Sequence, residues 1–528
     1  MTSLAARAAQ WQRLADPAGH DLLVVGGGAT GLAVALEAVQ RGLRVALVEA
    51  GDFACGTSSR STKLLHGGVR YLAQGRLGLV REALAERARL LRAAPHLGAP
   101  LPFLLPVRGA RGRWVERWTW EAGLRVYDAL AGTARLESTR WLGVAAALEA
   151  SPGLDARGLS GALRYVDGQF EDARLALALA RSAAHRGAAV LNHCAAVELL
   201  HERGRVCGVV AEDRATGHRA RVRAGCVVNA TGVWVDRLRD QDTPEAPPLV
   251  TVSQGLHLVL GREFLPGGHA LLAPRTRDGR VLFAIPWLGH TLLGTTDTAR
   301  TDAPLAPEPL PGEVDLVLSE AAQLLGRAPA RRDVRSVWCG LRPLAATGTR
   351  AAATASVSRE HEVHTSPTGL VSVTGGKWTT CWRMAADTLA ACQASGRLPS
   401  PRPVAAMALR LHGAPPGMAD ASALTRPPGL RLYGTDAPRV QALPGADAEV
   451  APGLTEAMVR FAAREEMALG VEDVLARRHR LLFLDARAAR EAAPRVARIL
   501  EEELGPAFDA AASCDAFTAL AARYTCPA

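Results

Sequence analysis

The chain has 528 residues, and at roughly 100–200 residues per domain this length predicts about two to four domains. Apolar residues make up 48% of the sequence and charged residues 22%, a balance that excludes a disordered or collagen-like chain. The net charge of +10 favours anionic partners such as phosphorylated substrates or anionic lipid. We do not expect nucleic acid as a partner, because the arginines are spread along the chain and no RNA-binding module is apparent.

The cysteines give no sign of a metal or disulfide framework. There are 9 of them, and no two are spaced CxxC, so we expect no metal site and a reducing compartment. Residues 1–20 hold no apolar segment of the kind a signal peptide needs. The longest apolar stretch, 22–36, is about 15 residues long, which is too short to cross a bilayer. These features predict a cytoplasmic protein.

The first predicted elements are a strand, a glycine-rich turn, a helix and a second strand, at 21–25, 26–31, 32–41 and 43–48. A charged helix is predicted at about 79–92, where apolar residues recur at helical spacing. Short β-branched runs predict strands at 221–229 and 369–374. Further strands are predicted within 249–297, a helix at 379–389, and helices across 454–525.

These elements predict an α/β fold with a discontinuous Rossmann-like nucleotide-binding domain, a β-rich substrate domain and a helical C-terminal domain. The nucleotide-binding domain is expected to comprise 20–95, 160–245 and 335–398. The substrate domain is expected to comprise 96–159 and 246–334. Prolines cluster after 398, which predicts a linker over 399–430 before the helical domain at 431–528.

The glycine-rich turn predicts a dinucleotide site. Gly26, Gly28 and Gly31 lie between a predicted strand and a predicted helix, and Glu49 ends the following strand. In this arrangement a pyrophosphate rests on the helix N-terminus, and the carboxylate accepts hydrogen bonds from a ribose. The alternative is an ordinary glycine-rich turn, since the motif alone is weak.

Two later glycine turns favour FAD over NAD as the dinucleotide. The segment 227–232 ends a strand with Thr231 and Gly232, and 369–376 ends a strand with Gly375 and Gly376. Both suit backbone contact with a nucleotide, and the helix after the second turn can stabilise negative charge on a flavin ring.

A hydroxyl-rich loop at 53–71 has little apolar periodicity. Its backbone and hydroxyl groups can hold phosphates or the edge of a flavin, and Arg70 follows as a cation. The residues of this loop that we expect near the cofactor are Thr57, Ser58, Ser59, Lys63, His66, Gly67 and Gly68.

From Gly26 to Tyr71 the sequence resembles the FAD-dependent glycerol-3-phosphate dehydrogenases, whose signatures include the glycine fingerprint and a TSS…HGG-x-RY loop. The resemblance continues in order through 229–236, 285–287, 294–297, 340–344 and 375–380, and into the C-terminal region at 464–467 and 473–478. It implies an FAD-binding domain of the glutathione-reductase/D-amino-acid-oxidase type. It also implies oxidation of sn-glycerol 3-phosphate to dihydroxyacetone phosphate, with a hydride passing to flavin N5 and electrons to a membrane quinone.

The phosphate of such a substrate needs cations. Arg70 and Arg342 are the candidates, because a guanidinium can bind phosphate oxygens through two parallel hydrogen bonds. Tyr71 and Lys377 are expected to add donors, the latter also beside the cofactor.

His257 is the candidate general base, since it alternates with apolar neighbours on a predicted strand and a neutral imidazole can take the hydroxyl proton. A lone histidine on a strand is more often structural, but its match to the family's Gly-x-His segment favours the base.

Four positions depart from the family pattern. Gln254 and Leu256 stand where a lysine and a serine are usual, and Cys381-Trp382 replaces Tyr-Arg. These changes put the finer substrate contacts in doubt. Lysine itself is rare here: the chain has two, Lys63 and Lys377, and both lie in the motifs.

Quinone reduction requires contact with lipid, so we expect peripheral attachment to an anionic surface of the cytoplasmic membrane. The best local candidate is 108–125, where arginines alternate with tryptophans: Arg108, Arg111, Arg113 and Arg117 with Trp114, Trp118 and Trp120. The alternative interpretation of this segment is a partly buried helix of the substrate domain.

Two other activities stay open on the same scaffold. One is a glycerol-phosphate oxidase that passes electrons to oxygen. The other is a 2-hydroxy-acid or amino-acid oxidase whose arginines bind a carboxylate. Whether the chain forms a homodimer is also left open.

Overall fold

The computed structural model describes residues 3–68, 72, 75–109, 113–277, 280–346, 360–399, 409–417, 420 and 422–526. The predicted phosphate contacts Arg70 and Tyr71 lie outside the described residues, as do Arg111 of the arginine–tryptophan segment and much of the predicted linker.

The first of two large sheets contains the predicted nucleotide-binding turn and has the strand order β17-β18-β10-β1-β2-β7. Its centre is parallel, since β1 pairs with β2 and β10, β2 with β7, and β10 with β18. Strand β1 is buried on both faces from Leu22 onward, as expected inside a parallel sheet covered by helices. The strands are β1 (His20–Val25), β2 (Val45–Val48), β7 (Ala189–Leu191), β8 (Cys194–Glu202), β9 (Arg205–Asp213), β10 (Arg219–Asn229), β17 (His361–Thr365) and β18 (Leu370–Gly375).

Helices α2 (Ala29–Gln40), α7 (Asp172–His185) and α10 (Cys381–Ala394) pack against this sheet, and α2 contacts both of the others. Helix α8 (Val235–Asp242) follows β10, and α1 (Ser3–Leu14) packs against β7. Helix α7 begins at two carboxylates: Glu171 accepts a hydrogen bond from the Arg174 backbone N–H at 2.6 Å, and Asp172 is the first helical residue. The helix dipole favours negative charge at this end.

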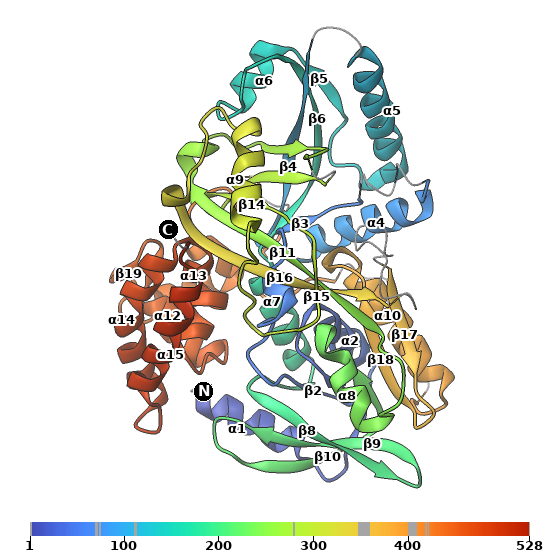
Figure 1. The fold of residues 1–528 in the computed structure, drawn as a ribbon. Coiled ribbons are helices and arrows are strands. Elements are labelled where there is room, and N and C mark those ends of the chain that lie inside the picture. Colours follow the sequence, from blue (N-terminus) through green and yellow to red (C-terminus); the bar gives the residue numbers. More distant parts are fainter. Residues whose placement is uncertain are drawn as a thin grey trace.

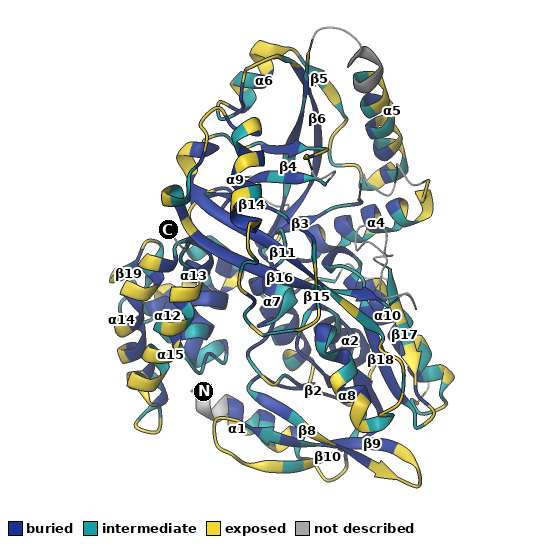
Figure 2. Cartoon of the chain, in the orientation of Figure 1, coloured by how far each residue is buried: buried dark blue, intermediate teal, exposed yellow. Residues whose placement is uncertain are grey.

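The second sheet has the order β15-β11-β14-β13-β12-β4-β6-β3, with β16 paired to β11 and β5 to β6. It lies above the first sheet in Figure 1. Strands β11 and β16 are buried along most of their length (Figure 2). The strands are β3 (Leu64–Leu65), β4 (Gly98–Arg108), β5 (Arg140–Leu142), β6 (Leu159–Phe170), β11 (Val250–Gly261), β12 (Ala270–Ala273), β13 (Leu282–Trp287), β14 (His290–Gly294), β15 (Thr298–Arg300) and β16 (Val334–Ala345). The helices beside them are α4 (Leu77–Ala93), α5 (Arg113–Ala131), α6 (Val144–Ala150) and α9 (Glu313–Leu324).

The two sheets divide the chain differently from the expected domain limits. Strands β3, β6 and β16 belong to the second sheet, whereas the sequence pattern places their residues in the nucleotide-binding domain. The reason is long-range pairing: β6 runs antiparallel along β4, and β16 along β11. Such partners leave no mark in the local sequence.

The C-terminal region is helical, as predicted, and lies to one side of the sheets (Figure 1). A short hairpin of β19 (Glu449–Ala451) and β20 (Leu454–Thr455) precedes most of its helices. The helices are α11 (Ala437–Gln441), α12 (Glu456–Glu465), a π-helical turn (Asp473–Arg478), α13 (Leu481–Leu484), α14 (Ala486–Leu504) and α15 (Ala510–Arg523). The predicted fold class is therefore confirmed. Within the described residues, none of the helices has both the length and the apolar character needed to cross a membrane.

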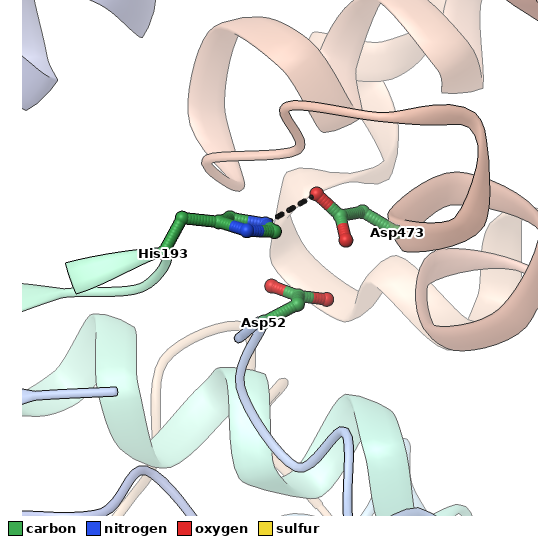
Figure 3. A group of neighbouring side chains, drawn as sticks. All are labelled: Asp52, His193 and Asp473. Carbon is green, nitrogen blue, oxygen red and sulfur yellow. Dashed lines mark hydrogen bonds and ion pairs between the residues drawn. The ribbon is translucent and has the colours of Figure 1, made fainter. Parts of the chain in front are cut away.

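A buried ion-pair cluster joins the C-terminal helices to the first sheet (Figure 3). The imidazole Nε2 of His193 lies 2.9 Å from Asp473, and Asp52 faces both side chains. Three such groups could chelate a metal, but their charge is already matched by arginines. Arg477 and Arg478 each lie 2.5 Å from Asp52, and Arg477 lies 2.7 Å from Asp473. We therefore assign the cluster a structural role.

This cluster makes stability depend on pH. Burial opposes a charge on His193, but Asp473 and Asp52 outweigh it and raise its pKa. The stabilisation is therefore complete below the ordinary histidine value of about 6.5 and is lost as pH rises through the raised pKa. We expect His193→Asn to cost about 1 kcal/mol more at pH 5.5 than at pH 8.5, measured as the loss of Tm. The exposed His218→Asn serves as the control. Equal losses of Tm at both pH values would contradict the assignment.

Candidate active site

A cavity of about 1440 Å³ is lined by residues of both sheets, and it exceeds the roughly 300–1,000 Å³ of an ordinary ligand pocket. The first sheet contributes the turns that follow β1, β10 and β18. The second contributes apolar side chains and a cation: Phe103, Tyr165, Leu272, Phe283 and Arg342. The three glycine-bearing segments, far apart in the sequence, thus meet at one site.

The turn after β1 is closely packed. Gly26 has φ +113°, and a Cβ there would lie 2.5 Å from the carbonyl oxygen of Ala230. A Cβ on Gly31 would overlap the carbonyl oxygen of Gly26. Gly28 caps helix α2 and lines the cavity, so the helix N-terminus is open to an anion.

Glu49 also lines the cavity, just after β2. Its carboxylate accepts hydrogen bonds from the backbone N–H groups of Gly27 at 2.6 Å and Gly51 at 2.8 Å. Burial raises its pKa. The tight turn, the open helix end and this carboxylate fit the pyrophosphate and ribose of a dinucleotide.

The hydroxyl-rich loop divides between the cavity and the interior. Thr57, Ser58, His66 and Gly68 line the cavity. Thr57 Oγ1 donates to the Leu341 carbonyl at 2.7 Å, and Ser58 Oγ accepts from the Ala29 N–H at 2.9 Å.

Ser59, Lys63 and Gly67 do not line the cavity and lie behind the loop residues that do. Lys63 is completely buried and donates to Asp172 at 2.7 Å. The backbone N–H of Gly67 donates to the Tyr127 hydroxyl at 2.7 Å, which in turn donates to Asp167 at 2.7 Å. Their role as cofactor contacts stays a prediction.

The turns after β10 and β18 reach the cavity through Thr231, Gly232, Gly375 and Gly376. Gly375 and Gly376 have φ of +75° and +70°, a conformation that favours glycine. Lys377 follows, lines the cavity and precedes the 3₁₀ turn Trp378–Thr380 that leads into α10.

His257 and Arg342 come to one face through strand register. In the antiparallel pair β11 and β16, His257 lies opposite Trp338 and Ser253 opposite Arg342. Residues two apart on a strand share a face, so both side chains point the same way. Gly255 between them leaves room, because a Cβ there would overlap the Arg342 guanidinium.

His257 is 2% exposed and stacks on Trp338 with ring centroids 4.2 Å apart. Its Nε2 lies 2.9 Å from Thr62 Oγ1, and its Nδ1 is buried with no hydrogen-bond partner among the described residues. Burial, with Lys63 and Arg342 nearby, holds the pKa of His257 well below its ordinary value. The imidazole is therefore neutral at physiological pH, as a general base must be.

The Arg342 guanidinium is anchored by loop residues after β14. It donates to Thr295 Oγ1 at 3.0 Å, the Thr296 carbonyl at 3.1 Å and Asp297 Oδ1 at 3.2 Å. The Gly-Thr-Thr-Asp segment at 294–297 is part of the family resemblance, but the sequence alone assigns it no role. The sequence also does not single out Thr62 and Trp338, which have no local signal because their contact with His257 crosses distant segments.

The departures from the family pattern lie in the core. Gln254 is buried, accepts a hydrogen bond from Arg300 at 2.6 Å and donates to Glu313 at 2.8 Å. Cys381 and Trp382 are buried in α10, and the Arg89 guanidinium lies 4.8 Å from the Trp382 ring. None of the three lines the described cavity.

Comparison with known proteins agrees with this architecture. Residues 21–390 match the FAD dependent oxidoreductase family, and 429–510 match the C-terminal domain of alpha-glycerophosphate oxidase. The mitochondrial glycerol-3-phosphate dehydrogenases of Arabidopsis thaliana and Homo sapiens are each 40% identical to the chain. The alignments cover 92% and 94% of this chain and 82% and 72% of those proteins, respectively.

The chain belongs to the FAD-dependent glycerol-3-phosphate dehydrogenase family. A solved member, the glycerol-3-phosphate dehydrogenase from Bacillus halodurans complexed with FAD, is 29% identical with a TM-score of 0.78. The match covers 99% of this chain and 98% of that one. The dehydrogenase is thus an FAD-dependent oxidoreductase, and the predicted cofactor is confirmed.

Proposed function

We propose that this dehydrogenase oxidises sn-glycerol 3-phosphate to dihydroxyacetone phosphate and passes the electrons to a membrane quinone. The observation that supports it most is the placement of a neutral imidazole, His257, and a fixed guanidinium, Arg342, on one face of β11 and β16 at the cavity. A base and an anion site on one face of the cavity suit a small phosphorylated alcohol.

Arg342 binds the phosphate. Its guanidinium is oriented by Thr295, Thr296 and Asp297 before any ligand arrives, so little side-chain entropy is lost on binding. Lys377 lines the same cavity and adds a second positive charge, and Arg70 and Tyr71 are proposed as further phosphate contacts.

His257 takes the proton of the substrate's C2 hydroxyl. When bound, FAD supplies N5, the acceptor for the C2 hydrogen and its electron pair. Loss of that hydride and of the hydroxyl proton converts the secondary alcohol into a ketone. Thr62, 2.9 Å from His257 Nε2, holds the imidazole in place for this transfer.

The glycine turns and Glu49 hold the cofactor. Gly26, Gly28 and the N-terminus of α2 receive the pyrophosphate, and Glu49 accepts from the ribose. The turns at Thr231–Gly232 and Gly375–Gly376 close the site with backbone contacts.

Helix α5 is the proposed route to the membrane. Trp120 lines the cavity, while Trp118 and Val126 are 54% and 44% exposed on the same helix. Arg125 is also exposed. An apolar, cationic outer face suits a peripheral anionic lipid surface, and the inner face then brings a quinone close to the cavity.

Two arginines of the segment 108–125 are occupied by other contacts. Arg108 pairs with Asp155 at 3.3 Å, and the Arg117 guanidinium lies 3.9 Å from the Trp141 ring. Arg125 also pairs, with Glu121 at 2.6 Å, but its side chain is 68% exposed. The membrane-facing part of the proposal therefore rests on Trp118, Arg125 and Val126.

We expect the double variant Trp118→Ser/Arg125→Glu to lower binding to anionic vesicles about 10-fold or more, because it removes an aromatic anchor and reverses a charge. Co-sedimentation with phosphatidylglycerol vesicles measures this effect. The matched control is Val144→Ser/Arg495→Glu, which changes an exposed valine and an exposed arginine elsewhere on the surface. Equal binding of both variants would exclude α5 as the contact.

The electron acceptor is tested by reoxidation. The enzyme is reduced anaerobically with sn-glycerol 3-phosphate and then mixed with a soluble quinone or with oxygen. The proposal predicts reoxidation by quinone at a rate compatible with turnover and much slower reoxidation by oxygen. Fast reoxidation by oxygen with peroxide release would indicate an oxidase. Reduction of the flavin by a 2-hydroxy acid or an amino acid, and not by the phosphorylated substrate, would indicate a 2-hydroxy-acid or amino-acid oxidase.

A further inference from the structure

A group of buried charges lies behind the His257 ring. Lys63 Nζ donates to Asp172 Oδ2 at 2.7 Å and to the Ser59 carbonyl at 2.9 Å. Arg480, from the C-terminal domain, lies 3.0 Å from Glu171 and 3.5 Å from Asp172. The side chains of all four charged residues are 0% exposed.

The Trp338 ring connects this group to the imidazole. Lys63 Nζ lies 4.7 Å from the centroid of the Trp338 ring, and the His257 ring stacks on Trp338 at 4.2 Å. Because both distances end at Trp338, the ammonium and the imidazole are within roughly 9 Å of each other, close enough for an appreciable interaction in a buried site.

The backbone at Lys63 directs the neighbouring side chains of Thr62 and Lys63 to different places. Lys63 has φ +64°, an uncommon conformation for a non-glycine residue. Thr62 contacts His257 Nε2 and lines the cavity, whereas Lys63 enters the interior toward Asp172. Ser61 Oγ also donates to Asp172 at 2.7 Å and fixes the turn on both sides of Thr62.

The charges around His257 are already balanced. Lys63 and Arg480 match Asp172 and Glu171, and Arg342 is matched by Asp297. A proton on His257 would therefore add a buried positive charge, and no carboxylate among the described residues is placed to pair with it, which is costly.

The protonation state of Lys63 agrees with this picture. Burial lowers its pKa to about 7, against the opposing effect of Asp172. The ammonium is therefore charged in the range below about 6.5, where an ordinary histidine takes up a proton.

We propose that Lys63 is a positioning residue whose buried ammonium, held by Asp172 against Trp338, adds to burial in keeping the His257 imidazole neutral and ready to accept the substrate proton. The inference rests on the proposed role of His257 as the base. It gives Lys63 a task other than contact with the cofactor.

The test measures the titration of His257 directly and the pH dependence of flavin reduction. Histidine ring ¹⁵N NMR, assigned with His257→Asn, gives the pKa without turnover. Anaerobic single-turnover reduction by sn-glycerol 3-phosphate gives the acid limb of the rate profile. Both are measured on FAD-loaded wild type, Lys63→Met and Lys63→Met/Asp172→Asn.

In Lys63→Met we expect the His257 titration and the acid limb to move up together by about one pH unit, because a nearby positive charge is removed. The double variant leaves no unpaired buried charge and covers the case in which the single variant does not fold. In this double variant we expect the His257 titration and the acid limb to move up as well, but by less than in Lys63→Met. The matched control Arg7→Met/Asp213→Asn removes another buried ion pair, 2.8 Å long, and should shift neither.

An unchanged His257 titration in every folded Lys63 variant would overturn the role of Lys63. Failure of the base assignment has a different signature: the NMR titration would move in the Lys63 variants while the acid limb stays in place.

Discussion

Replacing His257 with alanine is expected to slow reduction of the bound flavin by sn-glycerol 3-phosphate about 10²–10⁴-fold, the usual contribution of a general base. FAD should stay bound, because the glycine turns and Glu49 that we propose to hold it lie on the first sheet. The loss should appear in the chemical step, since the imidazole acts on the reacting hydroxyl. Stopped-flow absorbance of the flavin measures the rate, and the protein-bound FAD content is determined in parallel.

The pH profile separates this loss from a general structural effect. In the wild type the acid limb should lie below about 6.5, because burial, Lys63 and Arg342 hold the pKa of His257 down. In the variant this limb should disappear. The control is His479→Ala, which removes another buried histidine from the C-terminal region. A His257→Ala enzyme that reduces its flavin at the wild-type rate would refute the base assignment.

Replacing Arg342 with alanine is expected to raise the KM for sn-glycerol 3-phosphate about 100-fold or more, because the positive charge that attracts the phosphate is lost. Lysine at this position should recover part of the affinity, since it keeps the charge but not the planar fork. Steady-state kinetics with a soluble quinone measures both variants.

Unphosphorylated glycerol provides the matched control for Arg342. It lacks the group that the guanidinium binds, so its slow oxidation should change little in Arg342→Ala. An equal loss with both substrates would show that the variant disturbs the site through Asp297, which loses its ion pair with Arg342, and that phosphate recognition lies elsewhere.

The sequence predicts the tight glycine turn after β1 because its signals are local. The turn from Gly26 to Gly31 requires glycine for steric reasons that any Rossmann-like turn shares, and the structure gives these reasons as contacts with Ala230 and with Gly26 itself. The helical periodicity of the C-terminal region is equally local. The glycine turn and the C-terminal helices could therefore be predicted from the sequence alone.

The surroundings of His257 could not be predicted in the same way. Its partners Thr62 and Trp338 come from a loop and a strand far apart in the chain. The pairing of β16 with β11 places Trp338 beside His257, and Thr62 reaches it from the loop before β3. The placement of β6 and β16 in the second sheet is long-range for the same reason.

Lysine rarity pointed to Lys63, but it could not show that the side chain enters the core. The burial depends on a left-handed backbone conformation and on Asp172 and Arg480 from two other segments. Gln254 is a similar case: its replacement of the usual lysine is accommodated by Arg300, which approaches from β15.

Anaerobic mixing of the FAD-loaded enzyme with sn-glycerol 3-phosphate, followed by flavin absorbance and product analysis, tests the central claim most directly. The account predicts complete bleaching of the flavin with one dihydroxyacetone phosphate formed per FAD, and no bleaching by the enantiomer at the same concentration. A flavin that stays oxidised with sn-glycerol 3-phosphate, in enzyme that retains its FAD, would contradict it.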